Sequence, residues 1–327
     1  MLFEILRPIL QLLFGWSDTN IISKMTRKQV ARPIEEIPSK MVGETSPGHA
    51  PVSIRVITHN IRYATQAPFP GEERWPIRRP RLCSELVFNS SDPATFICLQ
   101  EVLHQQLQDV LESLNHFPAS DGEWAYIGVG RDDGKKAGEY SPIFYRPSVW
   151  QLKHWETRWL SQTPEVPSKG WDASCIRIVT VGDFVHFETG QKVRVLSTHL
   201  DDQGSRSREE SAKIILSLTD VKNASAILLG GDFNSPPGDG AYQIMTSPES
   251  IMEDIAMQVP EEQRYGNEMT FTSFGDVDNV PSRIDFIFAR KGDKITHRSY
   301  GVLANRFDDG VFSSDHRACV ADLLLSS

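Results

Sequence analysis

The sequence predicts an α/β fold in which two mixed β-sheets pack face to face and helices cover their outer surfaces. Three observations support this prediction. Short apolar runs typical of strands recur along the chain, helical periodicity separates some of them, and several strand-like runs follow one another directly. Strands that strictly alternate with helices form parallel sheets, so the adjacent strand pairs favour mixed sheets.

The expected strands occupy 53–61, 94–101, 141–146, 176–187, 192–200, 225–234, 283–289 and 318–325. Helical periodicity covers 78–90, 104–116 and 205–222, and a short helix is expected at 239–245, after a Pro-Pro-Gly turn. Several strands end in a polar cluster: HN at 59–60, QE at 100–101, THLD at 198–201 and GDFN at 231–234. Strand ends that converge on one sheet edge would bring these clusters into one cleft.

Residues 1–50 are expected to form an amphipathic segment and a linker, and residues 51–327 a compact domain. The segment at 2–16 has a wide apolar face and a thin polar stripe, and it is too short to span a bilayer. Peripheral membrane contact, docking to a partner and the absence of any role remain open. No coiled-coil heptad is present, so a monomer is the default expectation.

The net charge and the cysteines bear on the possible ligands and on the cellular location of the protein. The net charge of −9 argues against tight, sequence-independent binding of duplex nucleic acid. The four cysteines have no metal-finger spacing, and they are interpreted as free, mostly buried thiols in a reducing compartment. These features favour a cytoplasmic location.

The polar clusters contain the residue types that phosphate-ester hydrolysis needs. Glu101 follows an apolar strand and can bind Mg²⁺, with an oxygen from Asn60 as a further ligand. Asp232 is a candidate base for a water molecule, and Asn234 lies two residues further on, on the same side of an extended strand. His199 and His316 can bind or protonate phosphate oxygens, and Asp285 can orient an imidazole.

Six motifs in this order resemble the endonuclease/exonuclease/phosphatase superfamily: HN at 59–60, LQE at 99–101, STHLD at 197–201, GDFNS at 231–235, RIDFIF at 283–288 and SSDH at 313–316. The resemblance covers about residues 53–325 and implies a four-layered α/β/β/α sandwich. It also implies a Mg²⁺ site, with Mn²⁺ as the alternative ion, in which Glu101 is the principal ligand, Asn60 takes part and Asp315 lies beside the metal or the leaving group.

The same resemblance implies catalytic roles. His199 would contact the scissile phosphate, and Asp232 would activate the attacking water with help from Asn234. Asp285 would pair with His316, which would stabilise the phosphoryl oxygens. No matched catalytic position carries an inert residue.

Two stretches are less general. The segment 159–178 resembles an uncharacterised bacterial and fungal subgroup near the deadenylase-like branch, in which Trp171 would stack on a base or sugar and Arg177 would hold a phosphate. The alternative is that Trp159 and Trp171 only pack the flank of the domain. The Gly-rich segment 128–140 is either a loop at the cleft or a solvated hairpin.

The sequence therefore predicts a metal-dependent hydrolase of phosphate esters. A nuclease, acting like a 3′–5′ exonuclease on RNA or DNA, is the first expectation. A phosphatase or phosphodiesterase for an inositol phosphate or a phospholipid is the alternative. A binding module without catalytic activity is the remote third.

Overall fold

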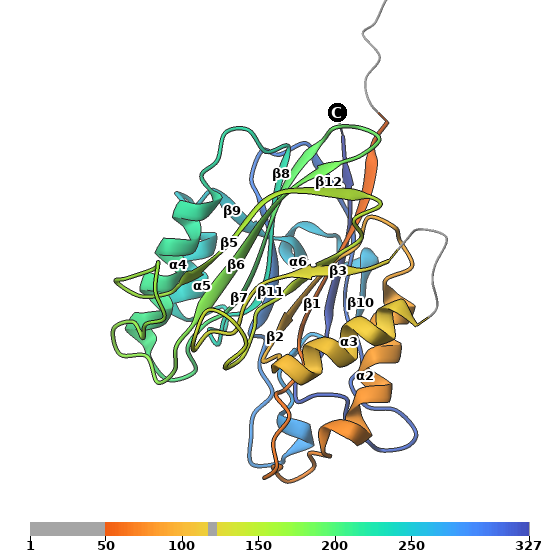
Figure 1. Cartoon of the computed structure of the whole chain (residues 1–327), viewed down its shortest axis with the longest axis vertical. Helices are drawn as coiled ribbons and strands as arrows, with labels where there is room; N and C mark the ends of the chain where they lie inside the picture. The colour runs from red at the N-terminus through yellow and green to blue at the C-terminus, as the bar shows by residue number, and fades with distance from the viewer. Residues whose placement is uncertain (1–49, 117–122, 327) are drawn as a thin grey trace, which may run out of the picture. The chain divides into compact units, whose positions relative to one another are not determined.

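The computed structural model describes residues 50–116 and 123–326, and the statements below concern these residues. They form two β-sheets with helices packed against them (Figure 1). The segment at 2–16 lies outside the described residues, so membrane contact there stays a prediction. None of the described helices is both long and apolar enough to cross a bilayer.

The first sheet has seven described strands in the spatial order β10-β12-β13-β1-β2-β4-β3. β1 pairs antiparallel with β13 and parallel with β2, so the sheet is mixed as expected. The strands are β1 (Val52–Asn60), β2 (Phe96–Gln100), β3 (Ala125–Ile127), β4 (Ile143–Tyr145), β10 (Arg264–Gly266), β12 (Ile295–Val302) and β13 (Cys319–Leu325).

The second sheet has six described strands in the order β5-β6-β7-β8-β11-β9. β7 and β8 are parallel, and β8 pairs antiparallel with β11. The strands are β5 (Trp150–Trp159), β6 (Ile178–His186), β7 (Lys192–His199), β8 (Ala226–Asp232), β9 (Met252–Asp254) and β11 (Asp285–Arg290).

Both sheets are apolar on both faces, because successive side chains of a strand point to opposite sides. On β1, Val56 packs into the core between the sheets, whereas Ile57 packs outward. On β8, Leu228 packs into the same central core and Leu229 packs outward. All four side chains are buried, so each sheet needs a second layer on its outer face.

Helices supply these outer layers (Figure 1). Leu82 of α2 (Trp75–Asn89) and Leu107 of α3 (His104–Asn115) belong to the cluster on the outer face of the seven-stranded sheet. Helices α4 (Ser205–Thr219) and α5 (Gly240–Thr246) pack on the outer face of the six-stranded sheet. The remaining short helices are α6 (Ile255–Gln258), η1 (Glu261–Gln263) and η2 (Ser273–Gly275). The α/β/β/α order of layers is confirmed.

Several elements differ from the expected ones for local reasons. Helix α2 begins at Trp75, three residues earlier than expected, because Pro76 is compatible with the first turn of a helix. Asp239 caps α5 by accepting the Gly240 N–H, so that helix begins one residue later. Strand β5 was not expected: it forms an edge of its sheet, and its exposed, charged side chains hide the apolar pattern.

Candidate active site

The polar clusters at the strand ends meet, as the parallel pairing requires. Asn60 at the end of β1 is in register with Gln100 at the end of β2, and His199 at the end of β7 is in register with Asp232 at the end of β8. Asp285 begins β11 directly opposite Asp232. The larger surface hollows, at 188–191 and at 220–224, contain none of the expected site residues.

Asn60 links the two sheets. Its Nδ2 donates to Glu101 Oε1 at 3.0 Å and to Asp232 Oδ2 at 2.9 Å, while its Oδ1 accepts the Arg62 N–H at 3.0 Å. These partners fix the orientation of the amide, because a reversed amide would set its oxygen against two carboxylates. Asn60 therefore holds two carboxylates close together and keeps one lone pair of its own oxygen for a ligand.

Glu101 lies just beyond β2 with a left-handed backbone, at φ 59°. Its Oε2 accepts the Tyr63 N–H at 3.1 Å and lies 3.7 Å from Nη1 of Arg62. Arg62 also pairs with Glu72, so a fixed cation stands beside the Glu101 carboxylate. Arg62 and Glu72 were not expected at the site, although only one residue separates Arg62 from the HN motif.

Asp315 is the last of the expected metal-site residues. Its Oδ1 accepts the Ser314 hydroxyl at 3.2 Å, and its main-chain oxygen accepts the Thr272 N–H. The same Ser314 hydroxyl lies 2.7 Å from the Asn60 carbonyl oxygen. Ser314 therefore connects Asp315 to the end of β1. Burial is the main reason why the pKa of Asp315 is raised. A bound cation would offset this cost, so the oxygen donors here fit a hard divalent ion.

Asp232 lies at the centre of the site. Its Oδ1 accepts the Asn234 N–H at 2.9 Å, and its Oδ2 lies 3.5 Å from Nε2 of His199 and 3.7 Å from Nε2 of His316. Burial and the neighbouring Asp285 carboxylate raise the pKa of Asp232 to about 7. The carboxylate can therefore exchange a proton near neutral pH.

Asp285 and His316 form a buried pair. His316 Nδ1 lies 2.8 Å from Asp285 Oδ2, so it can donate to that carboxylate. Burial opposes protonation of the imidazole, but Asp285 and Asp232 outweigh it and raise the pKa of His316 well above its ordinary value. At neutral pH the site thus contains an imidazolium whose Nε2 lies near Asp232.

His199 has the opposite character. Burial, followed by the charges of Arg177, Arg131 and His316, lowers its pKa well below the ordinary value. Its Nε2 lies 3.1 Å from Nδ2 of Asn234, which also donates to the Leu200 carbonyl oxygen at 3.1 Å. The neutral imidazole therefore accepts a hydrogen bond at Nε2.

The two expected substrate-binding residues lie on the segment before β6. Arg177 is buried, with Nε 3.4 Å from Asp201 Oδ2 and Nη2 2.9 Å from Asp202 Oδ1. Trp171 is half-buried, with a left-handed φ of 46°. Trp159, by contrast, is buried and donates its Nε1–H to the Arg131 carbonyl oxygen at 2.7 Å, so it supports the Gly-rich loop.

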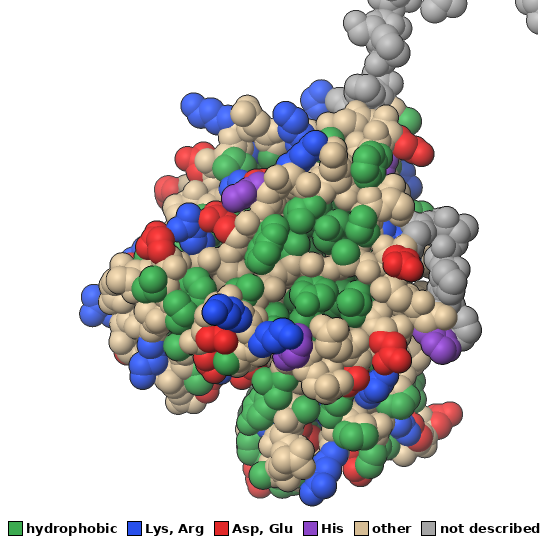
Figure 2. Space-filling model, viewed as in Figure 1, with side chains coloured by type: hydrophobic (Ala, Val, Ile, Leu, Met, Phe, Trp, Pro, Cys, Tyr) green, Lys and Arg blue, Asp and Glu red, His purple; other side chains and the backbone are tan. Residues whose placement is uncertain are grey.

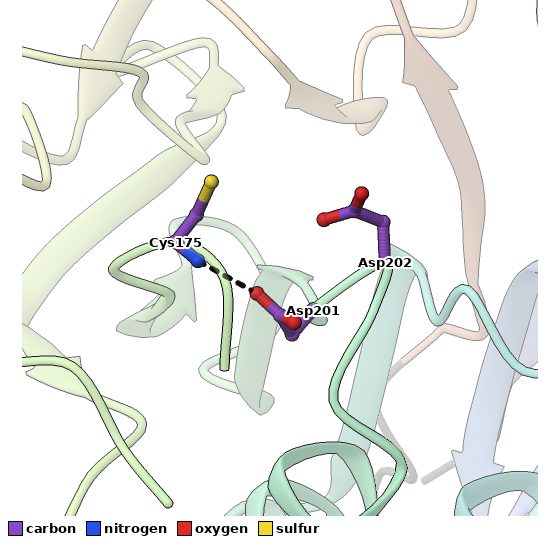
Figure 3. Close-up of side chains that lie close together, drawn as sticks. All are labelled: Cys175, Asp201 and Asp202. Atoms are coloured by element: carbon purple, nitrogen blue, oxygen red, sulfur yellow. Dashed lines mark hydrogen bonds between the residues drawn. The ribbon is translucent and has the colours of Figure 1, made fainter. Parts of the chain in front are cut away.

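Asp201 fastens this segment to the end of β7. Cys175, Asp201 and Asp202 lie close enough to hold a metal ion, but Figure 3 shows that the Cys175 N–H, and not its sulfur, is directed at the Asp201 carboxylate. That carboxylate accepts four backbone N–H groups, those of Ser174, Cys175, Gln203 and Gly204. Burial opposes ionisation of Asp201, but these donors and Arg177 lower its pKa to about 2. The Asp201 carboxylate therefore has a structural role: it acts as a clamp that holds the backbone at 174–175 against that at 203–204.

The Gly-rich segment 128–140 reaches the site through two charged residues, Arg131 and Glu139. Arg131 Nη1 donates to Glu139 Oε2 at 2.8 Å, and both side chains are largely buried. They line a narrow recess together with Arg177 and His199. The pairing of these two side chains was not expected, because charged residues in a Gly-rich stretch look solvated.

Comparison with known proteins agrees with this architecture. The family model described as "Endonuclease/Exonuclease/phosphatase family" matches residues 57–316. A family protein from Bacteroides vulgatus is 32% identical, covers 84% of this chain and 99% of its own, and superposes with a TM-score of 0.74. The mannosyl-6-phosphatase Bt3783 of Bacteroides thetaiotaomicron is 31% identical over 83% of this chain and 99% of its own, with a TM-score of 0.70.

The catalytic domain of human Nocturnin shares the fold at 18% identity, covering 84% of this chain and 94% of its own, with a TM-score of 0.63. No curated protein matches the chain. The family typically uses a divalent metal and hydrolyses phosphate esters, and the chain is a phosphoric ester hydrolase. With its motifs, its layers and a family match over most of its length, the chain belongs to the endonuclease/exonuclease/phosphatase family.

Proposed function

We propose that this chain is a Mg²⁺-dependent phosphatase that removes the phosphate group from a small phosphorylated sugar. The observation that carries the proposal is that Asn60 holds Glu101 and Asp232 together, with the Asp285–His316 pair beside Asp232. The similarity to a mannosyl-6-phosphatase, which extends over nearly all of that chain, supports the substrate class. This substrate differs from the nuclease substrate expected first.

Glu101 and Asp315, with the free lone pair of Asn60, would hold the cation. Carboxylate and amide oxygens suit Mg²⁺, and Mn²⁺ shares that preference. When bound, the cation supplies positive charge for the phosphoryl oxygens. Asp232, Asp285 and His316 also have side-chain atoms close enough together to bind a metal ion. They suit a cation less well, because Asp285 keeps His316 protonated and only a neutral imidazole is a ligand.

The side chains divide the remaining work. The His316 imidazolium donates a hydrogen bond to a phosphoryl oxygen, where negative charge increases as the ester bond breaks. Asp232 orients the attacking water and accepts its proton, since its raised pKa suits proton transfer at neutral pH. Asn234 donates to the neutral His199 and holds it in place beside the phosphate.

Nuclease activity is the second candidate, because the half-buried Trp171 makes no ring contact with another aromatic side chain of the described residues and is free to stack on a base. The surface gives this candidate less support. In Figure 2, the Lys and Arg side chains of the visible face alternate with Asp and Glu and form no continuous basic band. Binding of a long polyanion relies on such a band.

The test is a substrate panel with purified protein and Mg²⁺: hexose 6-phosphates, inositol phosphates, sphingomyelin, and single-stranded RNA and DNA. We expect phosphate release from a hexose phosphate, abolished by EDTA and lowered at least ~10²-fold by Asp232→Asn. Asp183→Asn is the matched control, because Asp183 of β6 pairs with Arg194 of β7, away from the site. Shortening of RNA or DNA with all sugar phosphates untouched would overturn the proposal in favour of the nuclease.

A further inference from the structure

The recess beside His199 is the feature that the proposed reaction leaves unexplained. It is lined by Arg131, Glu139, Tyr140, Ser141, Arg177, Ile178 and His199. Its interior has no room for an atom the size of a water oxygen, but the side chains of Arg131 and Glu139 are 15% and 16% exposed, so a hydroxyl group on the edge of a sugar ring can reach them from the solvent side. Its walls come from the Gly-rich segment and from the start of β6.

The charges in the recess are already neutralised. Arg131 pairs with Glu139, and Arg177 pairs with Asp201 and Asp202. A second phosphate group would therefore find no net positive charge here. A guanidinium and a carboxylate that hold each other through one hydrogen bond still have free N–H donors and oxygen lone pairs. Such a pair can donate to and accept from one hydroxyl group.

The recess is held rigidly. The Trp159 indole N–H fixes the Arg131 carbonyl oxygen, and the backbone of Gly130 bonds to that of Lys135. The Tyr140 hydroxyl donates to the Lys135 carbonyl oxygen at 2.9 Å. Specific recognition requires such prior order, since side chains that must first be immobilised lose binding free energy.

His199 supplies an independent sign of a missing ligand. Because its Nε2 accepts from Asn234, its Nδ1 carries the proton of the neutral ring. That Nδ1 is buried and has no hydrogen-bond partner among the described residues. A buried donor without an acceptor is costly, so this wall of the recess favours an added oxygen acceptor over a further donor.

We propose that Arg131 and Glu139 determine specificity by binding a hydroxyl group of the sugar that leaves when the phosphate is removed. This inference rests on the proposed function, because it assigns the recess to the sugar of that same substrate. It also gives the Gly-rich segment a role at the cleft. Arg177 and its two carboxylates act as positioning residues that hold the opposite wall.

The experiment compares two substrates in the full-length protein: the hexose 6-phosphate that the wild type hydrolyses best, and p-nitrophenyl phosphate, whose leaving group carries no other hydroxyl. Glu139→Gln keeps an oxygen that can accept from Arg131, and Arg131→Lys keeps the charge but loses the planar fork. We expect each variant to lose about 10-fold more kcat/KM on the sugar phosphate than on the aryl phosphate. Lys136→Gln, an exposed change on the same loop, should preserve the wild-type ratio.

Thermal unfolding of each variant identifies any variant that fails to fold. In that case the kinetics of the other variant test the proposal. Equal losses on both substrates would contradict the subsite and would mean that the pair acts on the reaction itself through His199. Unchanged kinetics on both substrates would also contradict it. These results are distinct from failure of the proposed function, in which the wild type releases no phosphate from any sugar phosphate.

Discussion

The hydrogen bond between Asp285 and His316 gives the most quantitative prediction for the proposed mechanism. In Asp285→Asn the side chain keeps its shape but loses the charge that holds His316 protonated, 2.8 Å away. A hydrogen bond to a charged group is worth about 1.5–3 kcal/mol, and each 1.4 kcal/mol corresponds to roughly tenfold in rate. We expect kcat/KM to fall by about 10- to 100-fold at neutral pH.

The pH profile separates this effect from simple damage to the site. The wild-type pKa of His316 is raised, so the protonated form persists to higher pH than in an ordinary histidine and is lost as the pH passes that pKa. Without the Asp285 charge the pKa falls, and the alkaline limb of kcat/KM should move to lower pH. The variant should therefore lose more activity at pH 9 than at pH 6.

The assay is steady-state phosphate release from pH 6 to 9 for the wild type, Asp285→Asn and the control Asp183→Asn. The control removes a charge from an ion pair between β6 and β7 and should retain the wild-type profile. A uniform loss at every pH, with the alkaline limb unmoved, would refute the charge argument. A loss smaller than about threefold would refute the role of the pair altogether.

Three further predictions concern the segment around Asp201. Asp201→Ala leaves four backbone N–H groups without their acceptor. The free energy of unfolding in urea should therefore fall by about 3 kcal/mol or more. A fall of less than about 1 kcal/mol would mean that the clamp contributes little to stability. Because the pKa of Asp201 is lowered from 3.8 to about 2, its contribution to stability is complete above pH 3.8 and disappears as the pH falls through 2. Unfolding free energies at pH 5 and pH 3 should differ less in Asp201→Asn than in the wild type, and an equal difference would count against this assignment. Trp171→Ala should weaken hydrolysis of single-stranded RNA far more than that of p-nitrophenyl phosphate if the nuclease candidate is right, and equal effects would remove Trp171 from substrate recognition.

The sequence was sufficient to predict the layers, because β1 and β8 each carry apolar residues on both faces, which requires cover on both sides. The convergence of Asn60, Glu101, His199 and Asp232 also followed from sequence, since polar residues ended several strands. Strand β12 was not expected, because polar residues interrupt its apolar pattern.

The Arg131–Glu139 pair could not be predicted, because its burial depends on Trp159 and on contacts distant in the sequence. That Arg177 holds a phosphate stays a prediction, and its pairing with Asp201 and Asp202 was not foreseen. Tertiary pairing of this kind leaves no periodic trace in a sequence.

The most direct test of the central claim is a Mg²⁺ titration of phosphate release by the wild type and Glu101→Gln. Glu101 accepts hydrogen bonds from Asn60 and Tyr63, lies beside Arg62, and is the principal ligand in the proposed site. We predict no activity in EDTA, recovery on addition of Mg²⁺, and at least ~10²-fold lower activity of Glu101→Gln at the Mg²⁺ concentration that saturates the wild type. Wild-type activity that survives EDTA, or a Glu101→Gln titration that matches the wild type, would contradict the account.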